Sequence, residues 1–252
     1  MLDREKLART AAAFKRDAQR AFDEAVKALI DLAWSEKTPT IDFLWESDPE
    51  LDAKANAILR GLSDTLAQKA KDLAAELIRN SIEPDDAEPY DIDAIWDKAT
   101  ENDGIGVLFR FDMAGSHLKE LLEIWIALAI LNDIQKSELR VLISRYLNNP
   151  FASPLWRGIP RDILRWGRGY DKNILEQLAV IGQNSIIGAG RYAEWEDARR
   201  KGAQYYIRHR GSYYDCPDCD SLCGYPIPID EPFEWLHSRC MCWPEYFFEP
   251  MP

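Results

Sequence analysis

All five cysteines of the chain lie between Cys216 and Cys242, and none precedes them in the 252-residue sequence. Cys216 and Cys219 form a C-x2-C pair, a spacing that turns two thiolates toward one point and supplies half of a structural zinc site. After 17 further residues, His237, Cys240 and Cys242 follow as His-x2-Cys-x-Cys. Thiolate and imidazole ligands without a carboxylate favour tetrahedral Zn²⁺ over Mg²⁺ or Ca²⁺. We therefore expect one structural zinc ion in this segment.

More residues are available than a tetrahedral ion needs. We expect Cys216 and Cys219 to be ligands and prefer His237 and Cys240 as the second pair. Cys242 lies two residues beyond Cys240, so both side chains would point to the same side of an extended chain and either could bind. A shell completed by protein leaves no open coordination position, which makes the expected role structural and not hydrolytic.

Other uses of these cysteines fit the sequence less well. Disulfides are disfavoured by the odd number of cysteines and by the lack of a visible secretory signal in residues 1–15, which predicts a reducing compartment. An iron–sulfur cluster normally takes four more tightly grouped cysteines, and a redox C-x2-C pair needs a βαβ context. Cys223, just before Gly224, is expected to be a free, partly buried thiol.

This C-terminal segment resembles a known family. The order of a glycine-rich helix, a strand and the pattern Cys-Pro-x-Cys…Gly…His-x2-Cys-x-Cys is similar to that of the phage Mu F-like minor head proteins, also called phage head morphogenesis proteins. The resemblance covers about residues 175–243. The family usually has proline where Ser238 stands and arginine where Met241 stands, and its Arg-Thr-Glu segment near the helix start is absent here. The matching positions are Cys216, Pro217, Cys219, Gly224, His237, Cys240 and Cys242.

The resemblance implies a structural role in assembly of the phage or prophage head. It implies a non-enzymatic minor capsid protein that is made beside portal and major capsid proteins in the bacterial host cytoplasm and enters the virion head. Portal and capsid proteins would then be its partners.

Residues 155–210 are basic, with eleven Lys and Arg against six Asp and Glu, although the whole chain carries a net charge of −12. Interleaved aromatic residues would allow this segment to contact packaged DNA or an acidic partner. An alternative function is therefore a nucleic-acid-binding or nucleic-acid-cleaving effector, with His209 as the residue for cleavage. We favour the simpler interpretation, a solvated basic face that balances acidic neighbours. The candidate nucleic-acid-binding residues are Arg191, Arg199, Arg200, Lys201, Arg208 and Arg210.

Two long helices are predicted for the first 80 residues. Apolar residues recur at steps of three and four in both, and Ser47 or Asp48 is the expected cap of the second helix, with Pro49 in its first turn. These helices would form a hairpin that packs on itself, or alternatively a surface for self-association or docking; we favour the hairpin. The two stripes are Leu7, Ala11, Phe14, Ala18, Ala21, Ala25, Ala28 and Leu32, and Ala55, Leu59, Leu62, Leu66, Ala70, Leu73 and Leu77.

The remaining chain predicts further helices and one strand. We expect an acidic, proline-containing loop over 82–91, a short strand or ordered loop over 107–111, and an almost wholly apolar helix over 116–132. Another helix should follow over 133–149, then a short helix over 161–168. A long helix over 171–201 should be interrupted or kinked near Gly182 and Gly188–Gly190, and a strand should follow.

The expected fold class is mainly α, a helical body with a small C-terminal α+β module stapled by zinc. We expect a helical hairpin over 1–81, a helical core region over 82–170 and a helix–strand segment with the zinc module over 171–252. The longest apolar run, 124–131, is too short to cross a bilayer, which takes about 20 residues, so we expect no membrane partner.

Overall fold

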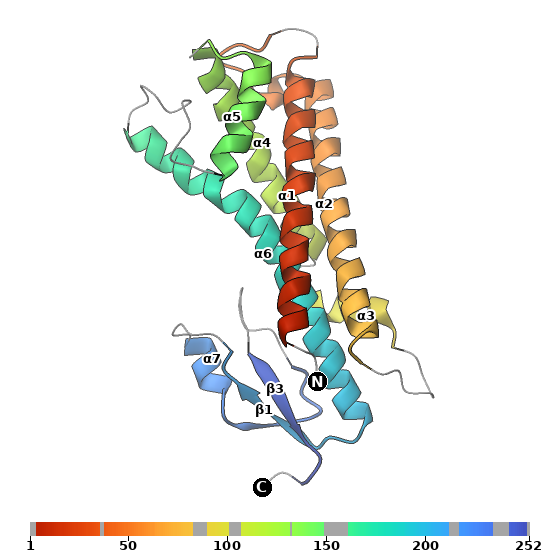
Figure 1. Ribbon diagram of the computed structural model, residues 1–252. Helices are drawn as coiled ribbons and strands as arrows, with labels where there is room; N and C mark the ends of the chain where they lie inside the picture. Colours follow the sequence, from red (N-terminus) through yellow and green to blue (C-terminus); the bar gives the residue numbers. More distant parts are fainter. Residues whose placement is uncertain are drawn as a thin grey trace. The chain divides into compact units, whose positions relative to one another are not determined.

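The computed structural model describes residues 4–35, 38–82, 90–100, 107–131, 133–148, 161–211, 217–233 and 242–250, with the backbone alone for 4, 142, 144–148, 161–173 and 218. The fold is mainly α with one small antiparallel sheet, which confirms the predicted fold class (Figure 1). The elements are α1 (Arg4–Ala33), the 3-10 turn η1 (Trp45–Ser47), α2 (Pro49–Arg79), α3 (Ile92–Thr100), α4 (Val107–Leu131), α5 (Lys136–Asn148), α6 (Arg161–Arg200), β1 (Tyr205–His209), α7 (Pro217–Leu222), β2 (Pro226–Pro228) and β3 (Trp243–Phe247).

The chain divides into two compact units, each built from segments that are distant in sequence. Unit 1 comprises residues 1–15, 68–107 and 180–252, and it contains the sheet. Unit 2 comprises residues 16–67 and 108–179. The sequence predicted boundaries at residues 81 and 170, which divide the chain into consecutive pieces. The two units are defined by contacts instead, and each combines pieces that are far apart in the sequence.

Both N-terminal helices are present, and their apolar stripes are mostly buried within the chain. Lys6 Nζ donates a hydrogen bond to the Asn80 carbonyl at 2.8 Å, which places the start of α1 beside the end of α2, as an antiparallel hairpin requires. Of the two predicted caps, Ser47 and Asp48, the structure has Asp48, whose Oδ1 accepts hydrogen bonds from the amides of Glu50 and Leu51 at 3.0 and 3.1 Å. The stripe residues therefore serve the interior of this chain.

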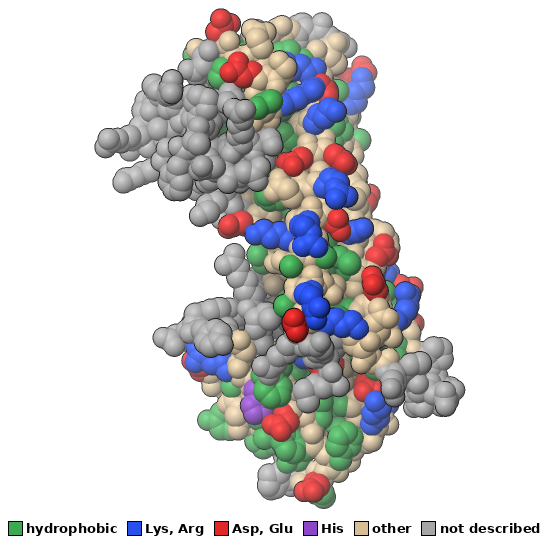
Figure 2. All heavy atoms as spheres, viewed as in Figure 1, with side chains coloured by type: hydrophobic (Ala, Val, Ile, Leu, Met, Phe, Trp, Pro, Cys, Tyr) green, Lys and Arg blue, Asp and Glu red, His purple; other side chains and the backbone are tan. Residues whose placement is uncertain are grey.

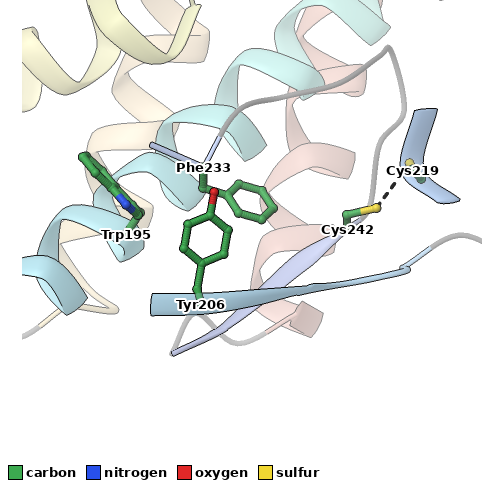
Figure 3. Packing of buried hydrophobic residues seen from close by; sticks show 5 residues of the cluster. All are labelled: Trp195, Tyr206, Cys219, Phe233 and Cys242. Carbon is green, nitrogen blue, oxygen red and sulfur yellow. Dashed lines mark hydrogen bonds between the residues drawn. The ribbon is translucent and has the colours of Figure 1, made fainter. Parts of the chain in front are cut away.

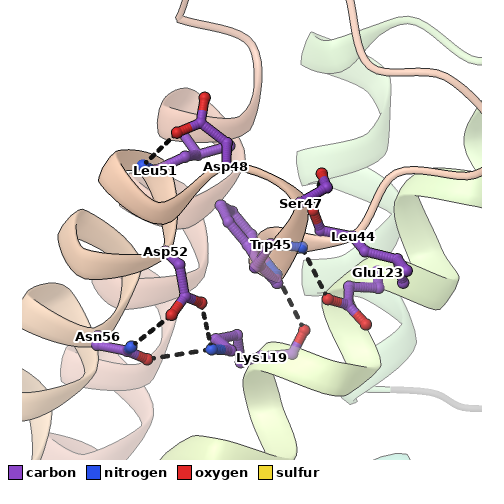
Figure 4. A network of polar contacts seen from close by, with 9 residues as sticks. All are labelled: Leu44, Trp45, Ser47, Asp48, Leu51, Asp52, Asn56, Lys119 and Glu123. Atoms are coloured by element: carbon purple, nitrogen blue, oxygen red, sulfur yellow. Dashed lines mark hydrogen bonds and ion pairs between the residues drawn. The ribbon is translucent and has the colours of Figure 1, made fainter.

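Unit 2 is organised around Trp45, whose side chain is fully buried (Figure 4). The indole Nε1 donates to the Lys119 carbonyl at 3.2 Å, and the Trp45 amide donates to Glu123 Oε1 at 2.9 Å. Lys119 Nζ also contacts Asp52 of α2 at 2.5 Å. These bonds join η1 and α2 to α4, and they satisfy the polar atoms that accompany a buried tryptophan.

The predicted strand or loop over 107–111 is wrong, because α4 already begins at Val107. Phe111, Ala114 and Leu118 are buried at helical spacing, so the apolar stripe extends across Gly115. A Cβ at Gly115 would lie 3.6 Å from Leu59 of α2, an ordinary packing distance. Packing along this face outweighs the cost of about 1 kcal/mol for a glycine inside a helix.

The predicted separate helix over 161–168 and the predicted interruption near Gly182 and Gly188–Gly190 are wrong, because α6 runs continuously from Arg161 to Arg200. Gly182 has a packing role, since any Cβ there would collide with the ring of Phe14 in α1. Gln183 Nε2 donates to the Ala11 carbonyl at 3.0 Å beside this contact. Glycine thus marks a close approach between helices and not a break in one.

The sheet has the strand order β2-β1-β3, with both outer strands antiparallel to β1. The predicted strand after α6 is therefore confirmed, and it is the central one. None of the described helices is both long and apolar enough to span a membrane.

Candidate metal centre

Strand β1 places its side chains alternately on the two faces of the sheet. Tyr206 and Arg208 share one face and are 1% and 2% exposed. Opposite them in β3 stand Tyr246 and Pro244, so this face is continuous over two strands. It is the face on which the buried cluster of the module packs.

The cluster combines three aromatic residues with two cysteines: Trp195, Tyr206, Phe233, Cys219 and Cys242 (Figure 3). The rings of Tyr206 and Phe233 lie 5.8 Å apart between centroids. The Trp195 indole donates to the Ile229 carbonyl at 3.0 Å, and the Tyr206 hydroxyl donates to the Pro232 carbonyl at 3.3 Å. These bonds fix the chain after β2 against α6 and β1.

The two cysteines of the cluster come from separate elements and meet at one point. Cys219 lies in α7, and Cys242 immediately precedes β3. Their sulfur atoms are 3.3 Å apart, and both side chains are buried (Figure 3). Two halves of the sequence motif are thus brought together, one residue from the C-x2-C pair and one from the His-x2-Cys-x-Cys group.

Neighbouring contacts hold α7 in this position. Gly224 adopts a φ of +85°, a conformation that favours glycine, and its amide donates to the Arg208 carbonyl at 2.9 Å. Arg210 Nη1 forms an ion pair with Asp220 Oδ1 at 2.8 Å. The turn after α7 and the helix itself are therefore both tied to β1 and its extension.

The sulfur pair fits a zinc–thiolate centre. With Zn–S bonds of about 2.3 Å in a tetrahedron, two ligand sulfurs lie roughly 3.8 Å apart, about 0.5 Å more than here. The two thiols are also buried among aromatic side chains. Such a site suits a soft metal ion that gives up its water ligands for sulfur. We therefore regard Cys219 and Cys242 as a half-site that suits zinc.

The other predicted ligands, Cys216, His237 and Cys240, lie outside the described residues. Within the part of the chain that the structure describes, no group of three or more Cys, His, Asp or Glu side chains is arranged to hold a metal ion. The full ligand set hence stays a prediction. Of the alternatives for the second pair, the described contact favours Cys242 as a companion of Cys219.

Cys223 is half-buried and packs against the same cluster, in agreement with the predicted partly buried thiol. Burial, together with the neighbouring Cys242, raises the pKa of the Cys223 thiol to about 11. The Arg208 guanidinium acts in the opposite direction on this pKa. Cys223 is thus a protonated thiol at neutral pH in the metal-free protein.

The six candidate nucleic-acid-binding residues do not form an open basic surface. Arg191 and Arg208 are buried, at 3% and 2% exposure. The other four pair with acids: Arg199 and Arg200 with Glu196, Lys201 with Asp197, and Arg210 with Asp220. On the face seen in Figure 2, basic and acidic side chains of the described residues are interspersed. These contacts favour the interpretation of a basic segment that balances acidic neighbours.

His209, the residue considered for nucleic-acid cleavage, has structural contacts within the sheet. Its ring stacks on Trp243 with centroids 4.3 Å apart, and its Nε2 lies 2.7 Å from Glu245 Oε2. Both partners belong to β3, so this side chain joins the two strands on the face opposite Arg208.

Sequence reasoning missed the residues that surround the sulfur pair. Phe233 and Trp195 were not singled out, and Arg208 was assigned to a surface. The alternation of β1 does contain a signal, because Arg208 shares a face with Tyr206. Which face was buried could not be read from five residues.

Comparisons with family models, with curated proteins and with solved structures give no match to this chain.

Proposed function

We propose that this chain is a non-enzymatic head morphogenesis protein, a minor capsid component of a phage or prophage whose C-terminal module is stapled by one zinc ion. The observation that carries the proposal is the buried contact between Cys219 and Cys242. It joins the two halves of the motif on which the family resemblance rests. The described order of α6, β1, α7 and the sulfur pair also agrees with the order of elements in that family.

Zinc would be held by Cys216, Cys219 and Cys242, with His237 or Cys240 as the fourth ligand. When bound, the ion supplies a cross-link between α7 and the start of β3. The cluster seen in the described part of the module is small, so metal binding on the order of 10 kcal/mol would contribute most of the module's folding free energy. A closed shell gives the ion a structural role.

Assembly in the host cytoplasm and incorporation into the virion head follow from the family resemblance. Partners of this class are the portal and capsid proteins, with self-association and packaged DNA as further contacts. Apolar side chains exposed on α4, among them Phe109 and Met113, one helical turn apart, offer unit 2 a surface for protein partners.

Two measurements test the proposal. Elemental analysis of the full chain, purified without added metal, should find about one zinc per chain; a metal-free protein whose residues 205–250 resist protease would contradict the zinc centre. Particles from the host that encodes the chain should contain it, and deletion of its gene should stop the formation of filled heads. Normal heads without the chain would contradict the assembly role.

The effector alternative has its own control. The purified chain should leave labelled DNA and RNA intact. Turnover that is lost in His209→Ala would instead identify a nuclease and overturn the structural role.

A further inference from the structure

A cavity lies in unit 1 between α3, α6 and the segment that follows β2. Its volume is about 530 Å³, within the range of about 300–1,000 Å³ that is usual for ligand sites. Trp195 and Ile95 are the most buried of its lining residues, at 6% and 5% exposure. Charged side chains, most of them exposed, surround this apolar floor, so the cavity is open to solvent. They are Asp91, Lys98, Glu196, Arg199, Arg200 and Asp230.

Contacts between the described residues fix the walls of the cavity to one another. Tyr90, just before α3, donates its hydroxyl to Asp197 Oδ1 of α6 at 2.6 Å, and the guanidinium of Arg200 lies 4.8 Å from the centroid of the Tyr90 ring. On the other side, the Trp195 indole donates to the Ile229 carbonyl at 3.0 Å. A cavity held in this way exists before its ligand arrives, which lowers the entropic cost of binding.

Aromatic and guanidinium surfaces line the α6 side of the cavity. The rings of Tyr192 and Trp195 lie 5.2 Å apart between centroids. The guanidinium carbon of Arg199 lies 5.7 Å from the centroid of the Trp195 ring. Its Nε and Nη2 donate to the two carboxylate oxygens of Glu196 at 3.0 and 2.8 Å, which fixes the plane of the guanidinium. Because aromatic rings and guanidinium planes both stack well on a further ring, this side suits an aromatic ligand.

The rim combines charges of both signs, with three cations and three acids among the lining residues. Each of the three walls carries one of the acids, Asp91, Glu196 and Asp230. A polyanion such as nucleic acid would therefore meet like charge on every side. A peptide backbone carries donors and acceptors along its length and can use both signs. Charge complementarity thus favours a peptide with nearly neutral flanks.

We propose that this cavity binds one aromatic side chain of a peptide segment supplied by a protein partner. The ring enters between α3 and α6, and the backbone on either side of it contacts the mixed charges of the rim. A buried aromatic anchor surrounded by polar contacts is the usual centre of a protein interface. The inference goes beyond the proposed head assembly role, since it names a binding site and the chemistry of its ligand for any partner that supplies such a segment.

The test titrates the full chain by calorimetry with three capped, Gly/Ser-rich nonapeptides whose central residue is tryptophan, leucine or alanine. The tryptophan peptide should bind at least about 10-fold more tightly than the alanine peptide, because it buries a ring. It should also bind about threefold or more tightly than the leucine peptide, because of stacking. Equal affinities for the tryptophan and alanine peptides would overturn the proposal, and equal affinities for tryptophan and leucine would overturn the aromatic preference.

A variant that fills the cavity tests the location. Ala94 is exposed on α3 and lines the cavity, so the ring in Ala94→Phe should occupy it and weaken binding of the tryptophan peptide at least about 10-fold. The smaller Ala94→Leu should weaken binding less. The matched control Ala53→Phe adds the same ring at an exposed position of α2, outside the lining, and should stay within about twofold of wild type. Wild-type affinity in both variants of Ala94 would place the ligand elsewhere and overturn the proposal.

Further measurements identify the class of ligand. N-acetyl-tryptophanamide carries the ring without the peptide and should bind at least about fivefold more weakly than the tryptophan nonapeptide. Equal affinity would assign the cavity to a small molecule and overturn the peptide partner. Displacement of the nonapeptide by a single-stranded DNA oligonucleotide would instead identify nucleic acid as the ligand and overturn the proposal. Zinc content and particle composition test the proposed function separately, so the two can fail independently.

Discussion

Around Trp45 the interior of unit 2 is made by long helices, whereas around Cys219 the interior of the module is made by a three-stranded sheet and a six-residue helix. In the first region, parts of α2 and α4, helices of 31 and 25 residues, bury repeated leucines and alanines. In the second, strands of three to five residues cover one cluster of five buried side chains.

The difference teaches how size determines the means of stabilisation. A long helix buries apolar area at every turn and depends little on any one contact. A short sheet has few such positions, so buried ion pairs, aromatic contacts and a metal cross-link take a larger share. Removing one group should hence affect the module far more than the helices.

The largest effect is expected from Cys219→Ser or Cys242→Ser. Either change removes one of the two sulfurs that lie 3.3 Å apart, and with it the zinc contribution of about 10 kcal/mol. Limited proteolysis should then cut within residues 205–250, while circular dichroism should retain the helical signal of α1 and α2. Cys223→Ser, in a residue outside the proposed ligands, is the matched control and should leave the digestion pattern unchanged. A module that stays protected in Cys219→Ser would remove the contrast between the two regions.

The next largest effect concerns the buried ion pair of α6. Arg191 and Glu194 are each 4% exposed at their side chains and lie 2.7 Å apart. Glu194→Gln leaves the arginine charge buried, and we expect a loss of about 3–5 kcal/mol in the free energy of unfolding. The control is Lys201→Met in the exposed pair with Asp197, which should cost less than about 1 kcal/mol. Equal denaturant midpoints for both variants would show that burial does not strengthen the pair.

A smaller effect is expected from a methyl group placed between helices. Gly182→Ala would force a Cβ against Phe14, so we expect a loss of about 1–3 kcal/mol. Gly61→Ala, in α2, meets nothing within 4 Å and should stabilise the protein by about 0.4–1 kcal/mol. Thermal unfolding of the two variants compares them directly. If both changes stabilise the protein, α1 and α6 do not approach as closely as described.

The smallest effect is a dependence on pH in unit 2. Burial raises the pKa of Glu123 above its ordinary value, although the amide of Trp45 and the charge of Lys119 oppose the rise. The folded state therefore holds this proton more tightly, and stability falls as pH rises from the unfolded value through the folded one. Glu123→Gln should abolish this part of the pH dependence in urea unfolding and leave stability at low pH nearly unchanged. A variant with the same profile as wild type would assign the dependence to another group.

Sequence periodicity predicted the long helices well because their apolar residues repeat over many turns. The Asp48 cap and the five-residue strand after α6 were also found, since each has a local signal. A glycine misled the prediction at Gly182, because a helix tolerates glycine where another helix approaches closely. That approach depends on a residue more than fifty positions away and cannot be read locally.

The candidate site was predictable in part. The spacing of the cysteines indicated that Cys219 and Cys242 belong to one site, and the structure places them in contact. The spacing did not indicate the aromatic cluster around them or the burial of Arg208, because a cation in a short strand has the same sequence pattern on either face. Ion pairs such as Arg210 with Asp220 likewise depend on where α7 packs beside β1.

The outer strands of the sheet determine whether copies of the protein can pair edge to edge into fibres. Among the described strands, the order β2-β1-β3 leaves β2 and β3 at the edges, and an unguarded edge can template another strand. Two of the three residues of β2, Pro226 and Pro228, lack an amide hydrogen, and so does Pro244 within β3. Copies crowded together at high local concentration would thus find little to pair with along these edges, so any ordered assembly must use side-chain surfaces and not an endless ribbon of strands.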